Sequence, residues 1–200
     1  MKKSMIALSL MLASGAAAAQ SPDWNKVDVT YLDTELSAGG SDASFNGFGV
    51  NGSFSFSDHW IAFGNYKTVD KNVNDANLQL DMLSASIGYY HSVTDNTDIF
   101  ATVSAERLDV SGSSGDLSSS EAENGAGAGI GFRTMLTPSF ELGGKVDYLN
   151  IDSDNVFRTQ VKAFYYFTKH VAIGVGYEMY RPNGVALDID TLSASFRYAF

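Results

Sequence analysis

The chain has 200 residues, 13 of them basic and 23 acidic, with a formal net charge of −10 at pH 7 and no cysteine. The acidic excess argues against nucleic acid as a partner, because binding to nucleic acid requires a basic surface. The absence of cysteine excludes a disulfide framework and thiolate chemistry.

The N-terminal residues have the three parts of a secretory signal peptide. Lys2 and Lys3 form a charged start, residues 5–13 are apolar, and small residues end at Ala19. The apolar stretch is shorter than the roughly 20 residues that a transmembrane helix needs, so we expect cleavage and not anchoring. The sequence therefore predicts a signal peptide over residues 1–19, followed by a single exported domain of residues 20–200.

The exported part repeats one pattern, in which apolar and polar residues alternate and are then interrupted by Gly, Ser, Asn, Asp or Pro. Its longest apolar run, residues 163–167, is too short for a membrane-spanning helix, so a membrane role requires a β-barrel. We predict strands over residues 26–36, 45–57, 60–68, 77–92, 97–110, 123–136, 139–150, 156–168, 171–181 and 186–200. This order predicts an all-β fold, an antiparallel up-and-down transmembrane β-barrel of ten strands, with eight strands as the alternative.

The interruptions between these strands are of two alternating kinds. Short ones fall at residues 57–59, 94–96, 137–138 and 169–170, and longer or more acidic ones at 37–44, 69–76, 111–122, 151–155 and 182–185. Outer-membrane barrels have short periplasmic turns and longer outer loops. The alternation therefore predicts that both termini lie in the periplasm and that the strand number is even.

Alternation alone cannot say which face of the sheet is the exterior, because a soluble β-sandwich alternates as well. The end of the chain favours the membrane protein. One face of the last predicted strand carries Leu192, Ala194, Phe196, Tyr198 and Phe200. This ending resembles the C-terminal insertion signal of outer-membrane proteins. We therefore expect location in the outer membrane. The expected partners are membrane lipid, lipopolysaccharide, the barrel-insertion machinery and periplasmic chaperones, with a monomer as the expected oligomeric state.

Three segments carry a wider resemblance. They are FGVNGSFSFSDHWIAFGNY (residues 48–66), IGYYHSVTDNTDIFATVSAERLDV (87–110) and the final SFRYAF. They resemble the small outer-membrane barrel domains of the outer membrane protein A and X type. More narrowly, they resemble a group of exported barrels discussed as signalling or immunity-triggering factors of plant pathogens. The resemblance implies a structural barrel, an adhesin or a narrow channel.

If the apolar faces meet lipid, a balanced set of charges faces the lumen. These residues are Asp28, Glu106, Glu141, Asp147 and Glu178 against Arg133, Lys145, Arg158, Lys162 and Arg197. Buried charges are costly unless they are paired, so we predict salt bridges across the lumen. Four inward glycines, Gly125, Gly127, Gly129 and Gly131, would leave room for the long side chains. We predict a largely plugged lumen; the alternative is a narrow passive channel in which a pair such as Glu106 and Arg158 exchanges partners.

The other candidate motifs are weak. The glycines of residues 47–52 spell G-x-G-x-x-G, but they lie inside a predicted strand and not between a strand and a helix. His59, His91 and His170 lie near predicted periplasmic turns, away from the outer acids Asp188 and Asp190. A surface hydrolase is thus a remote alternative, and no catalytic residue, metal or cofactor is expected. Calcium or magnesium bridging from the acidic outer loops to lipopolysaccharide is a further hypothesis.

Overall fold

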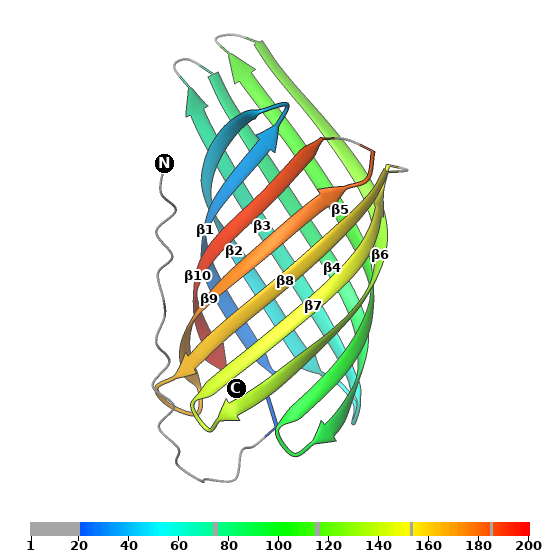
Figure 1. The fold of residues 1–200 in the computed structure, drawn as a ribbon, viewed down its shortest axis with the longest axis vertical. Helices are drawn as coiled ribbons and strands as arrows, with labels where there is room; N and C mark the ends of the chain where they lie inside the picture. Colours follow the sequence, from blue (N-terminus) through cyan, green and yellow to red (C-terminus); the bar gives the residue numbers. More distant parts are fainter. Residues whose placement is uncertain (1–20, 74–75, 115–116, 153, 185) are drawn as a thin grey trace.

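The computed structural model describes residues 21–73, 76–114, 117–152, 154–184 and 186–200, and the predicted signal peptide lies outside them. Ten antiparallel strands form one closed barrel (Figure 1). The strands are β1 (Lys26–Ala38), β2 (Ser41–Ser55), β3 (Trp60–Val73), β4 (Ala76–Thr94), β5 (Thr97–Ser114), β6 (Leu117–Thr137), β7 (Phe140–Ile151), β8 (Asp154–Tyr166), β9 (Val171–Pro182) and β10 (Leu187–Ala199). Among the described residues no helix is long and apolar enough to cross a bilayer.

The barrel closes between its first and last strands. β1 pairs with β10 over its whole length, from Lys26 opposite Ala199 to Ala38 opposite Leu187. Every other strand pairs with its neighbours in the sequence. This closure removes the open sheet edges that a bilayer does not tolerate. The prediction of a ten-stranded up-and-down barrel is confirmed, and the eight-stranded alternative is wrong.

The strands are longer than the sequence predicted. The expected outer loops at residues 37–44, 69–76 and 111–122 are mostly strand, and β4, β5 and β6 reach 19, 18 and 21 residues. Between β1 and β2 only Gly39 and Gly40 form the turn, with φ angles of 58° and 85° that suit glycine. The Ser-, Asp- and Asn-rich segments were interpreted as loops because both of their faces are polar. Cross-strand backbone hydrogen bonds hold them as strands nonetheless.

The two ends of the barrel differ. The end that we call the termini end carries the start of β1, the end of β10 and the turns at residues 56–59, 95–96, 138–139 and 167–170; the opposite one is the hairpin end. At the hairpin end two hairpins rise above the rest of the wall (Figure 1). Pairing of β2 with β3 stops at Asp70, and pairing of β6 with β7 stops at Gly125. We call the described part beyond these points, residues 71–73, 76–83, 107–114 and 117–124, the protruding sheet.

The outer face of the barrel wall is apolar. Aromatic residues form a ring at each end of this apolar band, with small and aliphatic residues such as Val103 and Ile130 between them. The ring at the termini end contains Phe56, Trp60, Tyr89, Tyr165, Phe167, Tyr198 and Phe200, and the ring at the hairpin end contains Tyr31, Tyr66, Tyr148 and Tyr177. An apolar band between two aromatic rings is typical of a barrel seated in a membrane. The apolar strand faces therefore point to lipid and the polar ones to the lumen.

Candidate functional site

The interior of the barrel is arranged in three layers along its axis. An aromatic cluster lies at the termini end, a layer of charged side chains lies in the middle, and two apolar clusters lie at the hairpin end. The middle layer contains the residues that the sequence assigned to the lumen.

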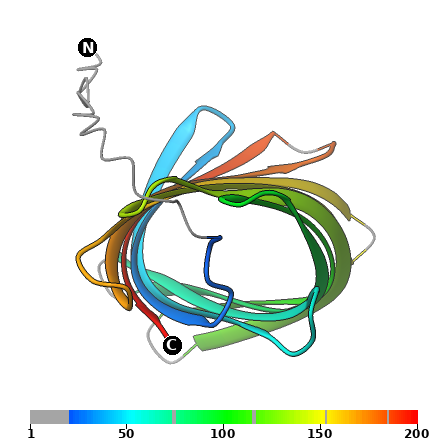
Figure 2. The ribbon, with the colours of Figure 1, turned by 90° about the horizontal axis from the view of Figure 1, so that it is seen from below.

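The layer at the termini end is built around an N-terminal segment, residues 21–25, that turns into the lumen before β1 begins (Figure 2). Trp24 is 4% exposed and lies among Ile61, Phe63, Tyr90 and Phe100. Its ring centroid is 5.3 Å from that of Phe100, in an edge-on arrangement, and 5.3 Å from that of Tyr90. The first described residues therefore form part of the barrel interior.

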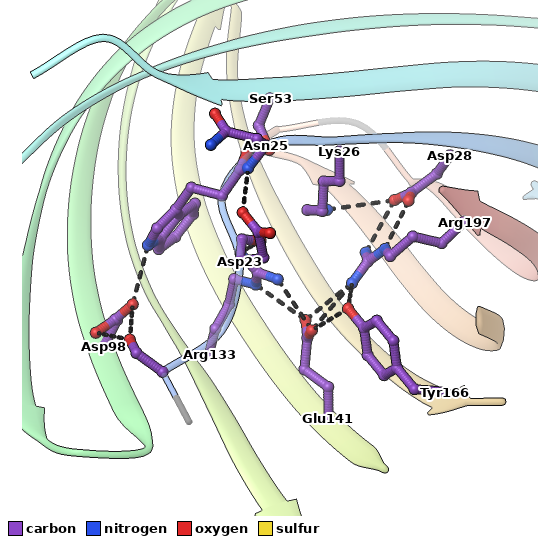
Figure 3. A network of polar contacts seen from close by, with 12 residues as sticks. Asp23, Asn25, Lys26, Asp28, Ser53, Asp98, Arg133, Glu141, Tyr166 and Arg197 are labelled. Carbon is purple, nitrogen blue, oxygen red and sulfur yellow. Dashed lines mark hydrogen bonds and ion pairs between the residues drawn. The ribbon is translucent and has the colours of Figure 1, made fainter. Parts of the chain in front are cut away.

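Polar contacts fix this segment from several strands (Figure 3). The Trp24 indole nitrogen donates to Asp98 over 2.9 Å, and Ser21 donates to the same carboxylate. Arg133 stacks over the Trp24 ring at 4.5 Å and donates to the Asp23 carbonyl over 2.8 Å. Sequence reasoning missed this arrangement, because a lone tryptophan before the first strand belongs to no periodic pattern.

The middle layer holds all ten charged residues that the sequence assigned to the lumen. Eight are buried, and Lys145 and Lys162 are partly exposed to the interior cavities. On one side, Arg197 bridges two carboxylates (Figure 3): it contacts Asp28 at 2.6 Å and Glu141 at 3.0 Å. Glu141 also receives two hydrogen bonds of 2.9 Å from Arg133. These residues come from β1, β6, β7 and β10, so the contacts tie separate parts of the wall together.

A second group lies around Arg158 on β8. This guanidinium contacts Asp147 at 3.0 Å and Glu106 at 3.3 Å, and Lys145 contacts Asp147 at 2.7 Å. Glu106 and Arg158 are the pair that the narrow-channel alternative expects to exchange partners, and here they are in contact. Removing one partner of such a buried pair costs about 3–5 kcal/mol, because the other charge then lies buried and unpaired.

Three further buried charges were missed. Lys67 on β3 pairs with Glu178, Lys26 contacts Asp28 at 3.3 Å, and Asp98 holds the N-terminal segment. Lys67 shares its inward face with apolar residues of β3, so polar and apolar positions do not alternate cleanly there. Lys26 is the first residue of its strand, where a face is hardest to assign.

The inward glycines of β6 provide space for larger neighbours, as the sequence suggested. A Cβ atom at Gly129 would lie 2.1 Å from the Asp147 carboxylate, and one at Gly131 would lie 2.5 Å from the Phe100 ring. Because these glycines have no side chain, the side chains of Asp147 and Phe100 can occupy the space beside them.

The layer at the hairpin end is apolar. One cluster contains Leu32, Phe45 and Val69, and the other contains Leu149, Val156 and Tyr180. Between the aromatic layer at the termini end and the apolar layer at the hairpin end, two cavities of about 120 and 20 Å³ lie along the charged layer.

The residues considered for catalysis do not come together. His59 stacks on Tyr89 at the termini end, and His170 contacts the Ala199 carbonyl at the same end. Asp188 and Asp190 lie at the hairpin end and pair with Arg181. Within the described ranges no group of three or more His, Cys, Asp or Glu residues is placed to hold a metal ion.

On β10 the two faces separate clearly. Leu192, Phe196, Tyr198 and Phe200 are 50–59% exposed on the outer face, and Ala194 shares that face. The opposite face carries Arg197, buried in the charged layer.

A closed antiparallel barrel with an apolar belt, two aromatic rings and a charged interior is the architecture of an integral outer-membrane β-barrel protein. The model of the family described as "Outer membrane protein beta-barrel domain" matches residues 4–200. The chain therefore belongs to this family, and its location is the outer membrane. No curated protein matches the sequence significantly.

Solved structures to which the chain is similar include those of three bacterial proteins. The translocator domain of the autotransporter NalP from Neisseria meningitidis has a TM-score of 0.51 and 11% identity, covering 92% of this chain and 91% of that one. Ail, the attachment invasion locus protein of Yersinia pestis, in complex with sucrose octasulfate, has a TM-score of 0.50 and 13% identity. The match covers 89% of this chain and 99% of Ail. The outer membrane protease OmpT from Escherichia coli has a TM-score of 0.48 and 12% identity. The match covers 92% of this chain and 99% of OmpT. At these identities the similarities to NalP and Ail show the fold alone.

Proposed function

We propose that this protein is a closed, non-conducting outer-membrane barrel that acts at the cell surface through its protruding sheet. The closed lumen is supported by the three interior layers, because apolar clusters cover the charged layer at both ends. Export removes residues 1–19 in this proposal, and residues 20–200 fold as one domain. The outward aromatic residues at the end of β10 serve the insertion machinery.

The orientation follows from the chain ends. In bacterial barrels with an even strand number, both termini lie in the periplasm and the longer hairpins lie outside the cell. This rule places the termini end in the periplasm and the protruding sheet outside the cell, beyond lipid and lipopolysaccharide.

The observation that carries the proposal is an unpaired strand edge. Residues 117–123 of β6 pair with β5 but have no partner on the β7 side among the described residues. The Asn124 carbonyl accepts from the Asp152 amide over 3.3 Å, so it points toward β7. Ala122 and Ser120 point the same way, because backbone groups alternate along an antiparallel strand. An extended segment of a partner can add to such an edge as a further strand.

Conductance tests the closed lumen. Purified protein reconstituted in planar bilayers should give no steady channels, and a narrow passive channel is the second candidate because charged side chains and a cavity of about 120 Å³ lie in the lumen. Reproducible unitary currents in the wild type would establish the channel and contradict the closed barrel.

Surface attachment tests the strand edge. Cells that display the wild type should attach to protein-coated surfaces better than cells with Ser120→Pro, since proline removes an edge amide donor without removing a bond to β5. Ser118→Ala, a substitution on the same strand face that keeps the amide, is the matched control and should attach like the wild type. Equal attachment by all three forms would contradict a role for the edge.

The protein is not an enzyme in this proposal. The histidines and the paired aspartates lie at opposite ends of the barrel, so they cannot form the acid and histidine pairs of a hydrolase.

A further inference from the structure

The charged layer carries more cations than carboxylates, although the whole chain is acidic. Its cations are Lys26, Lys67, Arg133, Lys145, Arg158, Lys162 and Arg197, and its carboxylates are Asp28, Glu106, Glu141, Asp147 and Glu178. Asp98 is the one further buried acid described, and it is occupied by Trp24, Ser21 and Ser92 below this layer. Even with Asp98 counted, the interior has an excess of positive charge.

The excess is located at Lys162. Among the described residues, Lys162 forms no ion pair within 4 Å and donates no side-chain hydrogen bond, whereas the other six cations of the layer are all in ion pairs. An ammonium group enclosed by the barrel wall is unfavourable unless an anion or water solvates it.

The neighbouring carboxylates are already occupied. Both oxygens of Asp28 accept from Arg197, and one of them also contacts Lys26. Glu178 accepts from Lys67 with one oxygen and from Gln160 with the other. The protein therefore supplies several anionic groups to this layer without leaving one for Lys162.

The surroundings leave space beside this lysine. Its cross-strand neighbours are both glycines, Gly143 on β7 and Gly176 on β9. The Lys162 side chain and the Ser193 hydroxyl already fill the space over Gly176, because an added Cβ atom would lie 3.1 and 2.6 Å from them, so the free space lies in the cavities. Lys162 lines both interior cavities, together with Lys67 and the amide side chain of Asn51. The larger cavity, of about 120 Å³, has room for several water molecules or for a small hydrated ion.

We propose that the cavity beside Lys162 is a binding site for a small inorganic anion of the size of chloride. The ammonium group of Lys162 supplies the charge, and neutral donors of the cavity wall, such as Asn51, complete the shell. The anion balances the lumen charge and acts as a structural ion. The site does not depend on whether the barrel conducts, so its test is separate from the conductance test.

Bromide diffraction is the first test. Crystals of the full barrel grown with sodium bromide should show an anomalous peak in the cavity next to the Lys162 Nζ atom. Crystals of Lys162→Met should lack that peak. Peaks on the outer surface only would mean adventitious ions, and this result would overturn the proposal, as would a cavity peak that persists in the variant.

Stability in solution is the second test, and it uses the wild type first. At constant ionic strength, replacing gluconate, a much larger anion, by chloride should raise the temperature at which the folded gel band of the wild type is lost. The chloride concentration needed for half of this shift should rise about tenfold or more in Lys162→Met, because a charged hydrogen-bond donor is removed. Lys169→Met, at an exposed turn, is the matched control and should respond like the wild type. A wild-type temperature that does not depend on the anion would refute the site, whether or not Lys162→Met folds.

Discussion

The charged layer and the protruding sheet are built from the same ten-stranded wall, but they place polar residues in opposite ways. In the charged layer, polar side chains face inward and are paired across strands, as Arg197 is with Asp28 and Glu141. In the protruding sheet, polar side chains occupy the outer face as well, and the ion pair of Arg107 with Asp109 is exposed. The comparison teaches that one part of the strands is specified by burial, whereas the tips of the other are held mainly by backbone pairing. Substitutions in the two regions should therefore have very different effects.

The largest effect is expected at the centre of the charged layer. Arg197→Ala would leave Asp28 without its two-pronged partner and take one cation from Glu141, at a cost of about 3–5 kcal/mol in the free energy of unfolding. Urea unfolding in lipid vesicles measures this change. Arg107→Ala in the protruding sheet removes an exposed pair and should leave the unfolding midpoint where it is. Equal effects of the two changes would break the comparison.

The next largest effect is expected at the termini end. Trp24→Ala would remove the indole from its aromatic cluster and leave Asp98 without that donor, at a cost of about 3 kcal/mol. Trp24→Phe keeps the ring but not the nitrogen, and should recover more than half of the loss. The midpoint of the heat-dependent gel shift measures both variants. A Trp24→Ala barrel as stable as the wild type would mean that the segment of residues 21–25 does not stabilise the wall.

A smaller effect is expected from the glycine face of β6. Gly129→Ala places a Cβ atom where the Asp147 carboxylate lies and should destabilise the barrel by about 1–3 kcal/mol. Gly64→Ala is the control on another strand, because nothing lies within 4 Å of its added Cβ atom, and alanine there should be neutral or slightly stabilising. Urea unfolding should separate the two alanine variants, and a stable Gly129→Ala barrel would show that Asp147 can move.

The smallest effects are expected in the protruding sheet, where they depend on which edge of β6 is changed. Ser119→Pro removes an amide that faces β5 and should cost about 1 kcal/mol, while Ser120→Pro removes one that faces the free edge and should cost less. Hydrogen exchange of the paired β5 amides should therefore increase in Ser119→Pro and stay unchanged in Ser120→Pro. The opposite order would mean that the edge of β6 is covered.

The sequence predicted the features that periodicity carries. Alternation gave the ten strands and the apolar outer face, because a wall between lipid and lumen must repeat every two residues. It also placed Arg197, Glu141 and Arg158 on the inner face, although not which carboxylate each of them contacts, since that depends on side chains from strands far apart in the sequence.

The features that could not be predicted from the sequence lie in segments that do not have one face toward lipid and the other toward the lumen. The polar hairpins were interpreted as loops, because alternation disappears where both faces meet water. Trp24 was missed because its segment enters the lumen without belonging to a strand. The unpaired state of Lys162 was missed because the list of inward residues omitted Lys26 and Lys67, and without them the charges looked balanced.

The placement of the two tryptophans also provides two intrinsic fluorescence probes of barrel assembly. Trp24 is enclosed inside the wall, and Trp60 stands 46% exposed on the outside at the same end. Brominated lipids quench indole fluorescence only at short range. In vesicles made of them, the fluorescence of Trp60 should therefore fall as the wall enters the bilayer, whereas the fluorescence of Trp24 should not change. Variants with a single tryptophan would then separate two steps of assembly: Trp60 reports insertion of the wall into lipid, and Trp24 reports packing of the N-terminal segment inside the barrel.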